Sequence, residues 1–554
     1  MTMRSTRWLV LAAVGLLALG AGVNVAAEGM PPYQVIEVAD DLGAEELAAA
    51  AGEKVDEGAK PQLPPAAPPA PKGMDFFNEA ESNDTTATAN ALPGSEAVVY
   101  GTIPANDVDY FSFTANAGDY VSAATMTSFS DGGSTDTELS IIASDGVTVL
   151  QFDDDKGSFS SLSSVVSGVV IPAAGTYYVF VDGSSTTSAI SPYHLHLRVL
   201  SGTPTAEVEP NNDTATANPL PASGWTSGNV SATTDPDFFS FDLNAGDSVF
   251  LALDMDPNRD PANTNWNGRL GIGLFGDADN MILVANDSST VKPHAEAFFY
   301  TVKEAGTYYA YVDSTSATGL GDNARYHLSV RVIPRRVQTD CTIIASTDVP
   351  VTIGPETGTV TSIVTVPGTI TSSINDLKVV LDLTHALMAD LELTLTSPDA
   401  TAVPLFTDVG PTATGGQVLM DLVLDENAAL PIGTFTVVKG MVNQPEQPGR
   451  LSSFNGEPAG GVWTLSITDD LTNTSGGTLN GWSLEVCGPQ PEPYAVQLSK
   501  TVGLEAGVCA TTDSVVVPPG GYQVYYCYTV RNTGLNTVNT HDLVDSELGT
   551  LFTG

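Results

Sequence analysis

Two groups of acidic and amide side chains carry the clearest chemical signal in this sequence. The first group contains Glu79, Glu81, Asn83, Asp84, Asp107 and Asp109. The second group contains Glu207, Glu209, Asn211, Asn212, Asp235 and Asp237. Calcium takes about six to eight hard oxygen ligands, and clustered carboxylates repel one another when no cation is present. The pattern predicts a structural calcium site in each group; the alternative is a solvated acidic loop that forms Asx turns.

The two groups correspond because they belong to tandem copies of one internal repeat. The copies share two long segments, one at 78–93 and 206–221 and one at 107–119 and 235–247. In the second copy Asn212 replaces Asp84, which removes one negative charge. We therefore expect the second calcium site to be weaker than the first.

Alternation of apolar and polar residues predicts the strands that position these groups. In 193–199, Leu195, Leu197 and Val199 share one face, while the histidines and the arginine between them share the other. Turn sequences such as NAGD and AAGT separate such stretches, and a third segment, 336–489, shows the same alternation. The fold class expected is all-β, with tandem antiparallel β-sandwich domains of the jelly-roll or immunoglobulin-like type.

The histidines do not form a catalytic or metal-binding pattern. His194 and His196 share a strand face, but the second copy keeps only His327 and has Ser329 at the other place. We expect a solvent-facing pair. The chain contains no HExxH and no G-x-S-x-G, so no catalytic residue is assigned and nothing suggests a triad of Ser, His and carboxylate.

Length and charge limit the classes of partner. The 554 residues predict several domains, and the net charge of −45 disfavours nucleic acid and anionic membrane surfaces. The 52 Gly and 36 Pro suit short strands joined by many turns. No segment after the first apolar run is long enough to span a membrane.

The N-terminus predicts export. Arg4 and Arg7 precede an apolar run, and Val25-Ala26-Ala27 forms a small-residue cleavage site, so 1–27 is predicted to be a signal peptide. Segment 28–73 is predicted to be an Ala/Pro/Glu-rich linker, with a propeptide as the alternative. The expected domains are repeat 1 (74–202), repeat 2 (203–335), the third segment (336–489) and an incomplete last segment (490–554). The protein is expected to be secreted, with the cell surface as a second location.

Four cysteines allow three connectivities. We favour Cys341–Cys487 and Cys509–Cys527, because each pair brackets one segment that has the properties of a domain. No C-x-x-C pair is present, so a zinc or redox site has no support.

The paired glutamates, the following Asn/Asp and the D-x-D-x-F-S-F strand resemble the bacterial pre-peptidase C-terminal domain. The resemblance covers about 76–200 and 205–333 and implies a small β-sandwich found beside secreted peptidases. Relatives of that family include collagen-binding modules of clostridial collagenases. This relationship implies that the acidic residues bind calcium near the linker.

The third segment resembles the P domain, or Homo B domain, of subtilisin-like proprotein convertases. The resemblance rests on DLTHALMADLELTLTSPDAT (382–401) and on FNGEPAGGVWTLSITDDLTNTSGGTLNGWSLEVCG (454–488). It implies that Asp390 and Asp469, at strand ends, can hold a structural calcium and that His385 serves packing or turn structure. The last segment, with YCYTVRNTG, is similar to conserved repeat domains of prokaryotic surface proteins and stops before a closing strand.

These features together predict a secreted, calcium-stabilised accessory protein without a catalytic centre in this chain. Its expected partner is an extracellular protein or polysaccharide polymer, which surface tyrosines of the Tyr177–Tyr178 and Tyr308–Tyr309 pairs could bind, or a secreted peptidase. The first alternative is the non-catalytic part of a subtilisin-like serine endopeptidase system. The second is a cell-surface adhesin.

Overall fold

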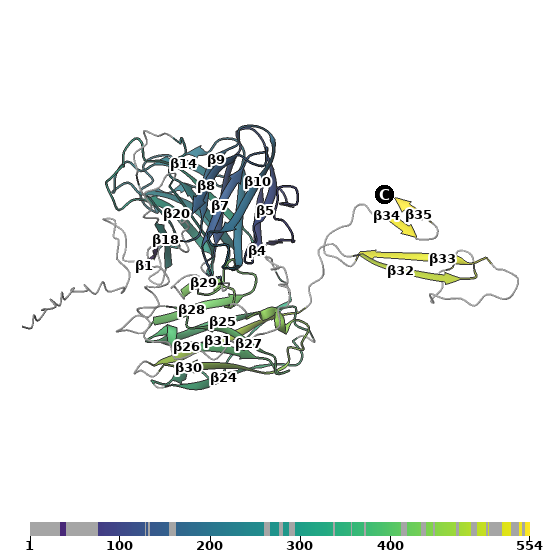
Figure 1. Ribbon diagram of the computed structural model, residues 1–554. Helices are drawn as coiled ribbons and strands as arrows, with labels where there is room; N and C mark the ends of the chain where they lie inside the picture. The colour runs from purple at the N-terminus through teal and green to yellow at the C-terminus, as the bar shows by residue number, and fades with distance from the viewer. Residues whose placement is uncertain are drawn as a thin grey trace, which may run out of the picture. The chain divides into compact units, whose positions relative to one another are not determined.

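The computed structural model describes residues 34–39 and most of 76–553 (Figure 1). The gaps are 128, 131–132, 155–161, 260–265, 267, 276–280, 287–293, 336–337, 339, 356, 371–372, 411–417, 434–438, 447–448, 472–475, 489–495, 506–507, 509–522, 533–541 and 546–548. The predicted signal peptide therefore lies outside the described residues. In the described part of the chain, no helix has the length and apolar character needed to cross a membrane.

The described residues fall into two compact units, which comprise 1–337 with 342–486 and 338–341 with 487–554. Both are built of strands, and the first also contains two short 3-10 helices, η1 (Met388–Asp390) and η2 (Leu451–Phe454). The predicted all-β fold with several β-sandwiches is confirmed.

Repeat 1 is a sandwich of two five-stranded sheets. One sheet has the order β3 (Asn90–Ala91), β5 (Asp109–Ala115), β10 (Gly175–Gly183), β7 (Thr137–Ile142) and β8 (Val149–Asp154). The other has the order β2 (Phe76–Asn78), β4 (Glu96–Ile103), β11 (Ile190–Leu200), β6 (Tyr120–Met126) and β9 (Val165–Val170). The apolar residues of the alternating stretches, such as Leu195 and Leu197, form the core between the sheets.

Repeat 2 has the same strand orders. One sheet runs β12 (Thr205–Ala206), β14 (Trp225–Asn229), β21 (Arg325–Ile333), β16 (Ser248–Asp254) and β19 (Ala295–Thr301). The other runs β13 (Asn218–Pro219), β15 (Asp237–Leu243), β20 (Gly306–Asp313), β17 (Arg269–Gly273) and β18 (Met281–Asn286), and β1 (Gln34–Ala39) adds a sixth strand. Part of the predicted linker therefore belongs to a sheet.

The third segment is a sandwich of its own. One sheet runs β22 (Cys341–Ala345), β31 (Gly477–Cys487), β25 (Asp376–His385), β28 (Val418–Asp425) and β29 (Lys439–Asn443), and β23 (Val351–Ile353) also pairs with β31. The other runs β24 (Gly358–Val366), β30 (Gly461–Asp469), β26 (Leu391–Thr396) and β27 (Ala402–Thr407). The Trp463 side chain is fully buried in its core, where its indole N–H donates to the carbonyl of Ala459.

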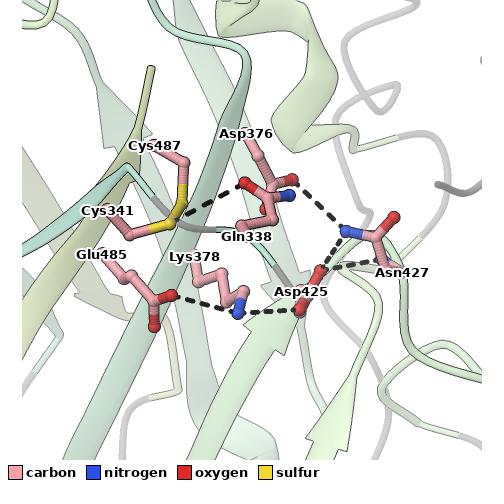
Figure 2. The surroundings of a disulfide bond; sticks show 8 residues. All are labelled: Gln338, Cys341, Asp376, Lys378, Asp425, Asn427, Glu485 and Cys487. Carbon is pink, nitrogen blue, oxygen red and sulfur yellow. Dashed lines mark hydrogen bonds and ion pairs between the residues drawn. A yellow bond between two sulfur atoms is a disulfide. The ribbon is translucent and has the colours of Figure 1, made fainter. Parts of the chain in front are cut away.

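One ionic network crosses three neighbouring strands of the third segment. Lys378 on β25 lies 3.5 Å from Asp425 on β28 and 3.2 Å from Glu485 on β31 (Figure 2). The Lys378 side chain is only 14% exposed, and the two carboxylates raise its pKa against the effect of burial.

The second unit contains the predicted disulfide bond between Cys341 and Cys487 (Figure 2). Its strands form two pairs, β32 (Val496–Gly503) with β33 (Tyr525–Asn532) and β34 (Asp542–Asp545) with β35 (Gly549–Thr553). Cys527 is also disulfide-bonded. Its predicted partner Cys509 lies outside the described residues, so that pairing stays a prediction.

The expected solvent exposure of His194 and His196 is wrong. Both side chains are 1% exposed, and the His196 ring stacks on Phe250 of repeat 2 with ring centroids 3.4 Å apart. Within the first unit, the sheet of repeat 1 that contains β11 packs against the sheet of repeat 2 that contains β16, and residues of both, such as Val98 and Leu251, share one apolar cluster. The face of β11 that the alternation of apolar and polar residues predicts to be solvent-exposed is therefore covered by the neighbouring repeat.

Candidate metal centres in the two repeats

The structure brings the carboxylates of the first predicted group together at the start of β5. Side-chain oxygens of Glu79, Glu81 and Asp109 all lie within 4.8 Å of one another. A second set, Glu81, Asp84 and Asp107, meets the same limit, so Glu81 belongs to both. Glu79 follows β2 and Asp109 begins β5, so both sheets of repeat 1 contribute to this site.

Neighbouring hydrogen-bond donors fix the two most buried carboxylates of this site. The backbone N–H of Thr102 donates to Glu79 Oε1 at 2.6 Å, and the Thr102 hydroxyl donates to the same oxygen at 2.8 Å. The Tyr193 hydroxyl donates to Asp109 Oδ2 at 2.5 Å. The other oxygen of Glu79, Oε2, is buried and receives no hydrogen bond. A cation at this point would supply the partner that this oxygen lacks.

Burial makes the negative charge of this site costly. Loss of hydration, followed by repulsion from the Glu79 carboxylate, raises the pKa of Asp109 to about 9. Burial likewise raises the pKa of Glu79 to about 7. At neutral pH the metal-free site therefore retains protons that a divalent cation would displace.

The fully buried amide of Asn83 lies among the same oxygens. One terminal atom of this amide is 3.0 Å from Asp109 Oδ1 and 3.2 Å from Glu81 Oε2. If that atom is nitrogen, it donates to both carboxylates; if it is oxygen, three oxygens face one another and need a cation between them. Rotation of the amide would therefore let the same residues suit this site both without and with a bound cation. The donor set, all carboxylate and amide oxygen, fits calcium.

Repeat 2 builds the same inner site. Glu207, Glu209 and Asp237 lie within 4.8 Å of one another, and the Tyr326 hydroxyl is 2.8 Å from Asp237 Oδ2 and 3.0 Å from Glu207 Oε2. Burial, followed by repulsion from Glu207, raises the pKa of Asp237 to about 10. The amide of Asn211 is fully buried 3.2 Å from both Glu209 Oε2 and Asp237 Oδ1.

The two repeats differ in the outer set. In repeat 2 the Asn212 side chain donates its amide N–H to Asp235 Oδ1 at 2.9 Å. The hydroxyl of Ser231 donates to the other oxygen of Asp235 at 2.6 Å. Asp235 therefore has protein donors on both oxygens, whereas in repeat 1 Asp84 and Asp107 face Glu81 as a third carboxylate.

Sequence reasoning misses the tyrosine and threonine donors. Tyr193 and Tyr326 stand at corresponding positions of the two copies, at the start of YHLHLRV and YHLSVRV. That repetition is the signal that could have identified them. Their role depends on the sandwich, which brings the ends of β11 and β21 next to β5 and β15.

The predicted pair in the third segment has a different environment. Asp390 and Asp469 are both buried, and His385 Nε2 lies 3.4 Å from Asp469 Oδ2. Burial raises the pKa of Asp469, while His385 opposes that effect. His385 Nδ1 is 2.6 Å from the carbonyl oxygen of Leu387, so this histidine closes a turn after β25. Asp390 and Asp469 do not belong to any set of three clustered ligands among the described residues.

Two segments match known protein families. Residues 374–486 match the proprotein convertase P-domain, and residues 107–183 match the bacterial pre-peptidase C-terminal domain. The chain thus contains one domain of each kind, as the sequence resemblance implies. The assignment of repeat 2 to the second family and that of the last segment to the surface-protein repeats remain predictions. No curated protein matches the chain significantly.

Similarity to solved structures is low. Aeromonas hydrophila PliG, a periplasmic inhibitor of g-type lysozyme, is 15% identical, with 20% of this chain and 95% of that chain covered and a TM-score of 0.16. The serine protease of Aeromonas sobria is 19% identical, with 28% of each chain covered and a TM-score of 0.15. The CBM22 tandem of Paenibacillus barcinonensis Xyn10C is 10% identical, with 46% of this chain and 96% of that chain covered and a TM-score of 0.14.

Proposed function

We propose that this chain is an exported accessory protein that calcium stabilises and that binds an extracellular partner without chemistry of its own. The observation that carries the calcium role is the inner site, which occurs in both repeats with the same carboxylates, buried amide and tyrosine donor. Burial of these carboxylates lowers the stability of the charged, metal-free protein, and calcium reverses that cost.

The partner class proposed is a secreted peptidase system of the subtilisin-like kind. Support comes from the two domain matches, since one is a proprotein convertase domain and the other a pre-peptidase domain. An extracellular protein or polysaccharide polymer is the second candidate. Tyr178 and Tyr309, the half-buried members of the two tyrosine pairs, provide aromatic surface for it.

Thermal unfolding of the full secreted chain tests the calcium role. A ligand at 100 times its Kd stabilises the folded state by about 2.7 kcal/mol, so millimolar calcium should raise the melting temperature relative to EDTA. Asp109→Asn with Asp237→Asn should remove most of that increase. Asp322→Asn, at an exposed position outside both sites, is the matched control. An unchanged melt of the wild-type chain in calcium and EDTA would contradict the proposal.

A further inference from the structure

A strand from the N-terminal region covers one sheet edge of repeat 2. Residues Gln34–Ala39 (β1) lie beside β18 (Figure 1) and pair with it in parallel. The register runs from Gln34 opposite Met281 to Ala39 opposite Asn286. The segment QVIEVA is rich in β-branched residues, which favour strands. The outer edge of β18 therefore accepts an added strand from a distant part of the chain.

The corresponding edge of repeat 1 is β8. In repeat 2, β20 pairs with β17 and β17 pairs with β18; in repeat 1, β10 pairs with β7 and β7 pairs with β8. In repeat 1, Phe152 on β8 pairs with Ser140 on β7. In repeat 2, Val284 on β18 pairs with Gly271 on β17. Phe152 and Val284 therefore occupy corresponding positions on the two edge strands. β8 is the last strand in its sheet, and no strand among the described residues covers it.

The β8 edge exposes apolar side chains. Val147 in the preceding turn is 80% exposed, and Val149 and Phe152 on the strand are 52% and 47% exposed. On the adjacent strand β7, by contrast, Leu139 and Ile141 are fully buried. An edge strand with exposed apolar side chains and unpaired backbone groups is a template for another strand.

We propose that the outer edge of β8, at Val149 and Phe152, binds an extended segment of another protein by strand addition. The segment has the chemistry of Gln34–Ala39, with β-branched apolar residues and at most one charge, because that strand occupies the corresponding edge of repeat 2. Among the described residues, β1 is the one strand of this kind that is added to either of the two corresponding edges, and it pairs with β18. Backbone hydrogen bonds supply affinity in this mode, and side chains next to Val149 and Phe152 supply selectivity. The inference deepens the accessory role proposed above and rests on it, but it uses a surface that contains none of the carboxylate sites.

The test uses a labelled synthetic peptide, PYQVIEVAD (residues 32–40), and the full secreted chain in calcium buffer. Fluorescence anisotropy should show saturable binding that Phe152→Lys and Val149→Lys each weaken at least tenfold. Val462→Lys, at a residue that is 49% exposed and lies on β30 of the third segment, should leave binding unchanged. Circular dichroism of each variant confirms that it folds.

Three results would overturn the proposal. The first is the absence of saturable binding. The second is binding that survives Phe152→Lys, which would mean that the peptide displaces β1 from β18. The third is self-association of the chain that Phe152→Lys abolishes. The last result would make a second copy the occupant of the edge. A failed calcium effect on melting with intact peptide binding would reject the metal role alone, so the two proposals fail separately.

Discussion

The Tyr193 hydroxyl donates a hydrogen bond of 2.5 Å to Oδ2 of Asp109, a fully buried carboxyl group. Burial raises the pKa of the Tyr193 hydroxyl well above its ordinary value, and the nearby Asp109 charge adds to the increase. The tyrosine is therefore a permanent donor. It holds Asp109 in the orientation that lets its other oxygen, Oδ1, face Asn83.

Removal of this donor should destabilise the metal-free protein. Tyr193→Phe leaves a buried oxygen of Asp109 without a partner, a loss of about 1–3 kcal/mol in the free energy of unfolding. Urea unfolding in EDTA measures it. Tyr110→Phe is the control, because the half-exposed Tyr110 ring packs on Phe180, with ring centroids 4.8 Å apart. Equal effects of the two substitutions would show that the hydrogen bond has no special role.

Stability of the metal-free protein should fall as the pH rises. The pKa values of Asp109 and Glu79 lie at about 9 and about 7, above the ordinary 3.8 and 4.5. The folded protein therefore binds more protons than the unfolded chain between about pH 4 and pH 9, and the free energy of unfolding decreases across that window. Calcium competes with these protons, so its affinity should increase with pH.

Melting temperatures in EDTA and in calcium, at about pH 5, 7 and 9, test this dependence. The difference between the two series should widen as the pH rises. Asp109→Asn should reduce this pH-dependent increase in the melting-temperature difference, because Asn cannot titrate. A difference that stays constant with pH would mean that these carboxyl groups are not the ligands.

The two repeats should bind different amounts of calcium. Repeat 1 has an inner and an outer set of carboxylates, whereas Asp235 of repeat 2 already accepts from Asn212 and Ser231. We expect about three calcium ions per chain. Isothermal titration calorimetry should show one site fewer in Asp84→Asn and one more in Asn212→Asp. If Asp84→Asn keeps the wild-type stoichiometry, the outer set does not bind an ion.

The disulfide bond should contribute strongly to stability. Cys341 and Cys487 are 146 residues apart in the sequence, and closure of so long a loop stabilises the folded state by about 5 kcal/mol on the chain-entropy model. Cys341→Ser with Cys487→Ser should lower the melting temperature of the third segment, measured by scanning calorimetry. Cys509→Ser with Cys527→Ser, which bracket a much shorter loop, should have a smaller effect. Peptide mapping of the wild-type chain should find Cys509 paired with Cys527.

Alternation of residue types predicts which side chains form the core, but not what covers the other face. Leu195 and Leu197 are buried as their pattern indicates, because the apolar face of a strand has to leave water. His194 and His196 on the opposite face follow the pattern of a solvated strand, yet repeat 2 covers them. That packing depends on the complementarity of two sheets that are far apart in the sequence, and no local pattern contains it.

The candidate metal sites show the same limit. Repetition in the sequence is enough to place Glu79, Glu81 and Asp109 in one site, because both copies keep these residue types at the same spacing. The donors from Thr102 and Tyr193 and the bond from Asn212 to Asp235 depend on the packing of strands. The register of that packing is a property of the whole sandwich.

The buried histidines should make the packing of the two repeats sensitive to acid. Burial lowers the pKa of His194 to about 3, and burial with the charges of Arg198 and Arg331 lowers the pKa of His196. Below about pH 6.5 the unfolded chain binds protons at these histidines that the folded protein excludes. The contribution of the neutral, buried histidines to the free energy of unfolding is therefore complete above that pH and is lost as the pH falls.

The carboxyl sites act in the opposite direction, so the test compares the wild-type chain and a histidine variant at each pH. His196→Phe keeps an aromatic ring next to Phe250 and removes the titration. Between about pH 7 and pH 4.5, the melting temperature of this variant in EDTA should change in the stabilising direction relative to that of the wild-type chain. A difference between variant and wild type that stays the same at both pH values would show that His196 is not responsible.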